Sequence, residues 1–283
     1  MSKVDQIDHL LEEVVTLPSL PDTVIRVTEL VNSPDCSLAE VGKAISADPG
    51  LALKTLRLVN SAYYGVRQEV TSIEHAVVLL GEKVIKNLVF TAMVFDKFKV
   101  GAGHFLRHCV ASGIAMRSLA QAVPLENQPE PDELFIYGLL HDVGRIVFHE
   151  FLADEYAQAL GVAHEKRLPL YQAEREVLQT DHAEMGGRLA KNWKLPEPMP
   201  EAIAHHHDAA ACDTLATVEL AAMLSIADHM CALSGFPSEP GVCTDVTPEA
   251  WQAFGVDSAQ IPAILDRFLD NLPAVDELLR LAE

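Results

Sequence analysis

The residues best suited to chemistry in this sequence are an imidazole and a carboxylate side by side in an apolar segment, His141 and Asp142 within residues 139–145. Successive helical residues lie about 100° apart, so both side chains can turn toward one side of a helix. Arg145 follows three residues later, on the Asp142 face. Burying such groups is unfavourable unless they are hydrogen-bonded, ion-paired or bound to a metal. The segment therefore needs polar partners from elsewhere in the chain.

Several histidines and one further aspartate are candidate partners: His104, His108, His182, the run His205-His206-His207, and Asp228. Histidine and carboxylate ligands from several helices suit a divalent ion such as Fe, Mn, Co, Ni or Zn, and they match calcium or magnesium poorly. The set is large enough for one or two ions, and Asp142 is the candidate bridge between two. For any single histidine, such as His75 or His164, the alternative is an imidazole that is hydrogen-bonded within the protein.

Length and composition set the broad class of the protein. With 283 residues, 49% of them hydrophobic, the chain can form one large or two medium domains without a metal or disulfide scaffold. The five cysteines are scattered and contain no C-x-x-C pair, which indicates reduced thiols. The acidic N-terminus does not match a secretory signal, so we expect a cytoplasmic protein.

Charge and hydropathy narrow the expected partners. A net charge of −20 repels phosphate backbones and argues against nucleic-acid binding, although the excess acid can also serve solubility alone. The net charge still permits a small anionic ligand if a metal or Arg145 makes the local electrostatic potential positive. The most apolar long segment, residues 76–95, contains Glu82, Lys83, Lys86 and Asn87, so we interpret it as a packed helix and expect no membrane span.

The elements of the first hundred residues are short helices without strand alternation. Apolar periodicity and capping patterns predict helices at 5–16, 22–31, 37–47, 48–59, 71–81 and 82–95. Ser37 with Glu40, and Thr71 with Glu74, have the spacing of capping boxes. This part resembles an interaction or scaffolding module, and Gly101-Ala102-Gly103 marks the predicted boundary after it.

The histidine-rich remainder is also predicted to be helical. Helices are expected at 105–123, 132–151, 153–165, 170–180, from 182, 201–207, 215–233 and from 248 onward. Residues 132–151 carry the His141-Asp142 pair, and 215–233 carry Asp228. Gly186-Gly187 indicates close contact with a neighbouring helix. The sequence therefore predicts an all-α fold.

The chain resembles the HDOD domain over residues 17 to about 210. HDOD is an all-helical module of bacterial signalling proteins, related to the HD and HD-GYP phosphohydrolases. The resemblance is carried by residues 17–21, 45–51, 60–62, 73–76 with 80–81, 107–109, 138–144, 182–186, 202–203 and 206–208. Together with the boundary at residues 101–103, it predicts an N-terminal helical subdomain (1–100), an HD-like subdomain with the His/Asp cluster (101–235) and a helical C-terminal extension (236–283).

The same resemblance implies a set of metal ligands. Residues standing where the HD-GYP family places its ligands are His108, His141, Asp142, His182, His206, His207 and Asp228. His205 falls one place early and is not expected to bind, and His104 is a marginal candidate where the enzymes can carry an acidic ligand. We expect one or two divalent ions of Fe, Mn, Ni, Co or Zn and no other cofactor.

Two departures from the HD-GYP pattern bear on activity. Arg145 replaces the lysine after the His-Asp pair, and a planar guanidinium is no simple substitute for an ammonium group. The Gly-Tyr-Pro element is absent, because His206-His207-Asp208 is followed by residues 209–212, Ala-Ala-Ala-Cys. The cyclic dinucleotide specificity of those enzymes is therefore not carried over.

Three functional hypotheses follow from the sequence. In the first, a regulatory HDOD protein acts through contacts with a protein partner. In the second, a metal-dependent phosphohydrolase or phosphodiesterase uses Asp142 at the metal and Arg145 as a phosphate contact, so that a small phosphorylated compound is the ligand. The third is a hybrid in which a retained metal is structural or sensory.

Overall fold

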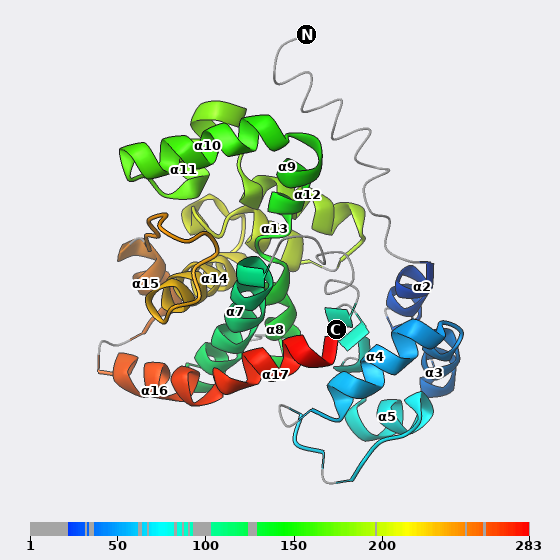
Figure 1. Cartoon of the computed structure of the whole chain (residues 1–283). Coiled ribbons are helices and arrows are strands. Elements are labelled where there is room, and N and C mark those ends of the chain that lie inside the picture. The colour runs from blue at the N-terminus through cyan, green and yellow to red at the C-terminus, as the bar shows by residue number, and fades with distance from the viewer. Residues whose placement is uncertain are drawn as a thin grey trace. The chain divides into compact units, whose positions relative to one another are not determined.

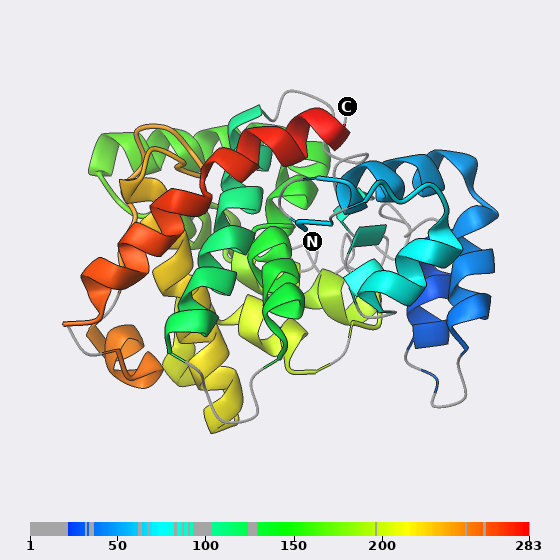
Figure 2. The same ribbon diagram turned by 90° about the horizontal axis from the view of Figure 1, so that it is seen from below.

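The structure is a computed structural model, which describes residues 22–31, 33, 37–61, 64–66, 68–81, 84–86, 88–89, 91–92, 103–123, 129–195, 197–246, 248–256 and 259–282. Within these residues every regular element is a helix, apart from one isolated bridge between Pro169 and Cys243. The predicted all-α fold is therefore confirmed (Figures 1 and 2). The helix predicted at 5–16 lies outside the described residues.

The contacts divide the chain into two compact units. Among the described residues, the smaller unit comprises residues 22–107 together with 270–282, and the larger comprises residues 108–269. The larger unit contains all seven predicted metal ligands. The domain limits proposed from the sequence stay a prediction.

The smaller unit is a set of short helices: α2 (Asp22–Val31), α3 (Leu38–Ser46), α4 (Pro49–Val59), α5 (Ile73–Leu80) and α17 (Pro273–Ala282). α3 contacts α2, α4 and α5, and α17 contacts α4. Described residues at 84–86, 88–89 and 91–92, within the helix predicted at 82–95, are helical. Each of the helices α2 to α5 buries part of its apolar residues, whereas Leu38, Leu53, Val78 and Leu79 are exposed.

One of the two capping boxes predicted for these helices is confirmed. Ser37 and Glu40 form the reciprocal capping box of α3, and Asp48 caps α4 before Pro49. The cap of α5 differs from the prediction by one residue. Ser72, not Thr71, accepts the backbone N–H of His75 (3.1 Å), while the Glu74 side chain accepts a hydrogen bond from Ser46 instead of closing a box.

The larger unit contains most of α7 (Gly103–Ala122) and α16 (Ile261–Asn271). Between them along the chain lie α8 (Pro131–Leu140), α9 (Gly144–Phe151), α10 (Ala153–Lys166), α11 (Leu170–Leu178), α12 (His182–Asn192), α13 (Met199–Ala204), the short 3₁₀ helix η2 (Ala209–Ala211), α14 (Leu215–Leu233) and α15 (Pro248–Phe254). α12 packs against α9, α11 and α13, and α14 packs against α8, α13 and α15. The elements that carry the predicted ligands are therefore neighbours.

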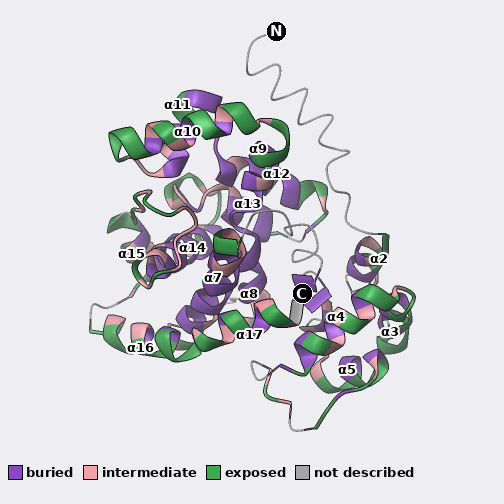
Figure 3. Ribbon diagram, in the orientation of Figure 1, coloured by how far each residue is buried: buried purple, intermediate pink, exposed green. Residues whose placement is uncertain are grey.

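The core of the larger unit is built around α14, whose bounds match the sequence prediction. Figure 3 shows α14, α7 and α13 largely buried, whereas α10 and α11 present exposed faces. By length and composition α14 is long and apolar enough to cross a membrane, the one such helix in the part of the chain the structure describes. However, 67% of its most apolar stretch is buried inside the protein. Its apolar surface is therefore used mainly for packing.

The predicted continuous helix at 132–151 is wrong, because the chain turns at the His141-Asp142 pair. α8 ends at Leu140, residues 141–143 form a turn, and α9 begins at Gly144. The N–H of Val143 donates to Leu140 O and that of Arg145 to Asp142 O, both at 3.0 Å, so the hydrogen bonds span three residues instead of four. The pair therefore lies at a corner between two helices.

Close backbone contacts hold this corner against the start of α12. A Cβ atom on Gly144 would lie 2.1 Å from His182 O and 2.6 Å from Gly186 N, so a larger residue does not fit. At Gly187 a Cβ atom would lie 2.5 Å from that of Ala204 on α13, which confirms the close helix contact predicted for the Gly186-Gly187 pair. Small residues thus bring the turn, α12 and α13 together.

We expect Gly144→Ala to destabilise the protein by about 3 kcal/mol, at the upper end of overpacking, because the new methyl group meets backbone atoms that cannot move aside cheaply. The matched control is Gly161→Ala on α10, where nothing lies within 4 Å of the added Cβ atom. That change should stabilise by roughly 0.5–1 kcal/mol through helix propensity. Urea unfolding measures both, and equal stability of the two variants would contradict the packing argument.

Candidate metal centre

The first group of predicted ligands joins α7, the turn after α8, and α14. The Nε2 atoms of His108 and His141 lie 3.2 Å apart. The Nε2 of His108 also lies 3.3 Å from Asp228 Oδ1 and 3.8 Å from Asp142 Oδ2. His108, His141 and Asp142 are 2% exposed or less, and Asp228 is 8% exposed. Residues 120 positions apart therefore meet in one buried space.

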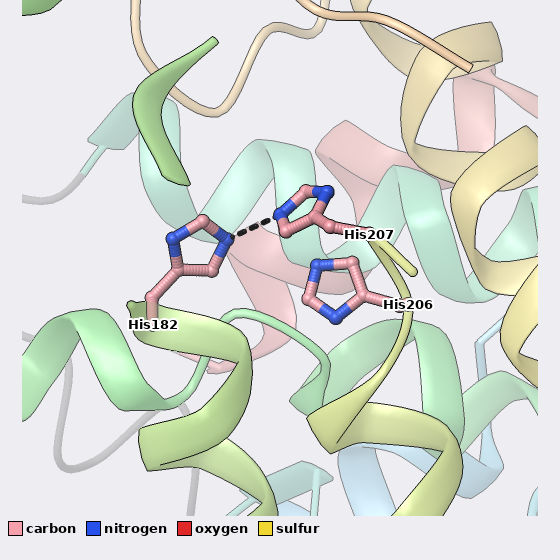
Figure 4. Close-up of side chains that lie close together, drawn as sticks. All are labelled: His182, His206 and His207. Atoms are coloured by element: carbon pink, nitrogen blue, oxygen red, sulfur yellow. Dashed lines mark hydrogen bonds between the residues drawn. The ribbon is translucent and has the colours of Figure 1, made fainter. Parts of the chain in front are cut away.

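The second group consists of His182, His206 and His207. Figure 4 shows their rings facing one another, with His182 at the first turn of α12 and His206 and His207 on the segment after α13. The Nε2 atoms of His182 and His207 lie 2.8 Å apart, and the centroids of the His206 and His207 rings are 4.0 Å apart. The ligand atoms of His182, His206 and His207 all lie within 4.8 Å of one another, and so do those of His108, His141 and Asp142.

Asp142 connects the two groups. Its Oδ1 lies 3.4 Å from the Nε2 of His141 and 3.1 Å from the Nε2 of His182. The rings of His141 and His206 also approach each other, with centroids 5.1 Å apart. The structure therefore brings together all seven predicted ligands around a central carboxylate.

Four of the imidazoles are held through their Nδ1 atoms. The Nδ1 of His108 lies 2.8 Å from Phe236 O, that of His141 lies 2.7 Å from Gly138 O, and that of His206 lies 2.8 Å from Ile203 O. The Nδ1 of His182 lies 2.6 Å from Glu174 Oε2. A carbonyl or carboxylate oxygen can only accept, so each Nδ1 carries a proton. When these rings are neutral, their Nε2 atoms are unprotonated and able to bind a cation.

Several polar atoms of the site fit a bound cation better than they fit each other. The His108 and His141 Nε2 atoms bring two lone pairs to 3.2 Å. The Nε2 of His206 and the Oδ1 of Asp228 are buried without a hydrogen-bond partner. Unsatisfied buried groups of this kind are unfavourable, and divalent cations bound at the two groups would satisfy them. The donor set of imidazoles and carboxylates suits Fe, Mn, Co, Ni or Zn.

The pKa values follow from burial and from the neighbouring carboxylates. Burial lowers the pKa of His206 to about 3 and lowers those of His108 and His141, which keeps these rings neutral. Burial also acts to lower the pKa of His182, but Glu174 and Asp142 on its two sides raise it well above its usual value. Burial raises the pKa of Asp228 to about 6. A positive charge at the site is thus favoured beside Asp142.

Glu174 on α11 belongs to the candidate site and was not predicted from the sequence. Its side chain is fully buried, and its Oε2 accepts hydrogen bonds from both the backbone N–H (2.9 Å) and the Nδ1 of His182. A carboxylate of this kind fixes the orientation and tautomer of a ligating histidine. A signal was present, because Glu174 stands on the apolar stripe that includes Leu170, Ala173 and Val177.

Arg145 is buried beside the site and its guanidinium donates to oxygens of the protein itself. Its Nη1 donates to Asp142 Oδ2 (3.2 Å), its Nε to the Tyr156 hydroxyl (2.8 Å) and its Nη2 to Glu239 Oε2 (2.9 Å). The predicted contact between Arg145 and the Asp142 face is therefore present. Arg145 as a phosphate contact stays a prediction.

A cleft is lined by four of the candidate ligands, Asp142, His182, His207 and Asp228, and by residues 238–239 and 242–245. Because Asp142, His182 and Asp228 are buried and residues 238–239 and 242–245 are partly or fully exposed, the latter form the outer rim of the cleft. We call residues 236–245 the strap. Phe236 O accepts from His108, Glu239 pairs with Arg145, and Thr244 hydrogen-bonds to His229 (3.1 Å). The strap is thus fastened to the residues around the ligands.

The other histidines considered from the sequence, among the described residues, belong to neither group. His205 is partly exposed and belongs to neither group, and His104 is exposed at the start of α7. His75 and His164 are also exposed. The proposed exclusion of His205 and the marginal standing of His104 are consistent with these positions.

We expect Glu174→Ala to destabilise the protein by about 3–5 kcal/mol, because it leaves the Nδ1 and N–H of His182 buried without their partner. Glu176→Ala on the same helix is the control. Glu176 forms a half-exposed ion pair with Lys166, so its loss should cost less than about 1 kcal/mol. Chemical denaturation compares the two, and a loss at Glu174 no greater than that at Glu176 would refute the bracing role.

Comparison with known proteins agrees with this arrangement. A family model described as the HDOD domain matches residues 17–209. A protein of Treponema pallidum (strain Nichols), described only as uncharacterized, is 27% identical over 210 residues, which are 70% of this chain and 39% of that protein. The chain therefore spans well under two-thirds of that relative.

Solved structures share the fold over nearly the whole chain. An HDOD domain protein of unknown function from Geobacter sulfurreducens is 27% identical, with a TM-score of 0.77 and coverage of 97% of this chain and 99% of that one. A protein of Shewanella amazonensis SB2B, named a candidate phosphohydrolase, is 24% identical, with a TM-score of 0.74 and coverage of 96% and 98%. At that identity the second likeness shows the fold alone.

Proposed function

The chain belongs to the HDOD family, and from this premise we propose that it is a regulatory signalling protein that retains a divalent metal site and acts through contacts with a protein partner. The observation that carries the metal site is the orientation of the buried histidines. His108, His141, His182 and His206 place their Nδ1 atoms against protein oxygens and turn their Nε2 atoms toward Asp142 and one another.

The ligands of the proposed site are divided between the two groups. His108, His141, Asp142 and Asp228 would hold one ion, and Asp142, His182, His206 and His207 would hold a second where two are bound. Glu174 orients His182 for this role. Coordination of this kind stabilises the folded state by mass action, because the unfolded chain does not assemble the ligands.

A regulatory role is favoured over catalysis by the charges around the cleft. Among the described residues that line it are Asp142, Asp228, Glu239 and Asp245, and these described lining residues contain no lysine or arginine. Arg145 donates through Nε, Nη1 and Nη2 to Tyr156, Asp142 and Glu239. A phosphorylated substrate therefore meets carboxylates at the mouth of the site. The absence of the Gly-Tyr-Pro element is in line with this preference.

Metal analysis of purified protein tests the site. We expect the wild-type chain, loaded with Fe or Mn, to retain metal, and His206→Ala to lose at least about tenfold in affinity, because it removes a buried donor. His205→Ala is the matched control, since the adjacent ring belongs to neither group. Thermal unfolding verifies that both variants fold. Wild-type protein that binds no ion, or equal losses of metal affinity in both variants, would contradict the proposed site.

A metal-dependent phosphohydrolase or phosphodiesterase is the second candidate function. It is favoured by one observation, the two ligand groups that share Asp142 at the inner end of a cleft. Metal ions in such a centre polarise a phosphoryl oxygen and lower the pKa of a bound water. The chain itself would contribute the bridging carboxylate of Asp142 and, after a change of partner, the guanidinium of Arg145.

A hydrolysis screen separates the two functions. Metal-loaded wild type and Asp142→Ala are compared on phosphomonoesters, phosphodiesters and cyclic dinucleotides. If the protein is regulatory, we expect no turnover above the Asp142→Ala background. Metal-dependent turnover that Asp142→Ala abolishes would replace the regulatory proposal by the enzymatic one.

A further inference from the structure

The strap residue Glu239 lies between a buried cation and the cleft. The Arg145 side chain is 3% exposed, whereas that of Glu239 is 28% exposed and lines the cleft. The Oε2 of Glu239 accepts a hydrogen bond from the Arg145 Nη2 at 2.9 Å. The carboxylate therefore covers the side of the guanidinium that would otherwise face a ligand.

We propose that the Glu239 carboxylate occupies a binding position for a ligand on Arg145. A ligand carrying a small oxyanion group, phosphate or carboxylate, displaces Glu239 from the guanidinium and so releases the strap from the metal site. This inference rests on the proposed function, because the ligand enters the cleft of the proposed metal site. To the proposed function it adds the chemical class of the ligand, an oxyanion, and the element that moves when the ligand binds, the strap.

The fixed contacts of Arg145 explain why Glu239 is the exchangeable partner. Asp142 and Tyr156, which accept from Nη1 and Nε, are buried and belong to the turn before α9 and to α10. Glu239 belongs to the strap, and it reaches Arg145 from the cleft rim. A displacement of Glu239 leaves the other two contacts in place, so the guanidinium keeps its position.

The replacement for Glu239 must itself be an anion. Removing one partner of a buried charge without substitution is strongly unfavourable. A guanidinium presents paired N–H donors that match the oxygens of carboxylate and phosphate groups. Displacing Glu239 also removes one of the carboxylates Asp142, Asp228, Glu239 and Asp245 from the cleft lining, and a divalent ion offsets others. Ligand binding and release of the strap therefore favour each other.

The strap has anchors on both sides of Glu239. Phe236 O accepts from the Nδ1 of His108, and Thr244 Oγ1 hydrogen-bonds to His229 on α14. The Pro169–Cys243 bridge adds a third point of attachment. Release of Glu239 thus frees the middle of the strap, residues 237–242, while its ends stay fastened.

Isothermal titration of the metal-loaded full chain with inorganic phosphate tests the competition. We expect Glu239→Gln to bind phosphate at least about tenfold more tightly than wild type. A neutral amide forms a weaker hydrogen bond to the Arg145 guanidinium than a carboxylate does, so phosphate displaces it more easily. Asp245→Asn is the matched control. It removes the same charge from the same cleft rim, and we expect a gain of less than about threefold, as for a solvated charge.

Acetate in a parallel titration distinguishes the two sources of an oxyanion. A gain for phosphate alone assigns a phosphoryl group, and a gain for both probes assigns a carboxylate-tolerant site. Equal gains in Glu239→Gln and Asp245→Asn would show a general charge effect and overturn the proposal. No gain in Glu239→Gln for either probe would overturn it as well.

Hydrogen exchange on the wild-type chain gives a second readout that needs no variant. Saturating phosphate should speed exchange of the amides of Ser238, Glu239, Gly241 and Val242, and unchanged or slower exchange there would refute the release of the strap. Metal content is measured on every sample. Wild type without metal overturns the proposed function, whereas metal-bearing wild type and Glu239→Gln with equal phosphate affinity overturn this inference alone.

Discussion

The larger unit depends on compensating several carboxylates that lie where little water reaches them. Asp142, Glu174 and Asp228 are each 8% exposed or less. Moving an ionised carboxylate into such surroundings costs several kcal/mol unless positive charge and hydrogen bonds compensate it. Arg145 supplies one positive charge, and the raised pKa of His182 between Glu174 and Asp142 shows the demand for another. A divalent ion would supply two positive charges at this place, whereas a proton on His182 supplies one.

Close backbone packing brings together the groups that compensate these buried charges. The hydrogen bonds of the 141–143 turn end α8 and place His141 and Asp142 at a corner. Gly144 lets that corner approach the first turn of α12 closely enough for Asp142 to reach His182. A side chain at Gly144 would push the two elements apart, and the two groups of ligands would no longer share a carboxylate. Stability and metal binding are therefore expected to depend on the same contacts.

Arg145 links Asp142 to residues outside the two ligand groups. A lysine at this position would present a single ammonium group, whereas the guanidinium of Arg145 reaches Asp142, Tyr156 and Glu239 through three separate nitrogens. The departure from the HD-GYP pattern thus has a structural consequence, because it ties the central carboxylate to α10 and to the strap. A change at the cleft rim can reach Asp142 through one side chain.

Local sequence signals located most of the helices, and family motifs identified the candidate ligands. Apolar periodicity located α14 and α2 at their observed bounds, and the capping box of Ser37 and Glu40 located the start of α3. These signals are local, since a cap or an amphipathic face depends on residues a few positions apart. The seven ligands followed from matched family motifs, and the structure places all of them together.

Only the tertiary structure decided where the helix at 132–151 breaks and which residues support the site. The break depends on Gly144 meeting the backbone of α12, a contact between segments 38 residues apart whose geometry no local pattern encodes. Glu239 has the sequence features of an ordinary acidic residue in an acidic chain, and the apolar stripe around Glu174 indicates its burial but not its partner. Glu174 gains its role by reaching His182, and Glu239 by reaching Arg145, 94 positions away. Periodicity predicts which face of a helix is buried, but the partner that a buried charge finds is set by long-range packing.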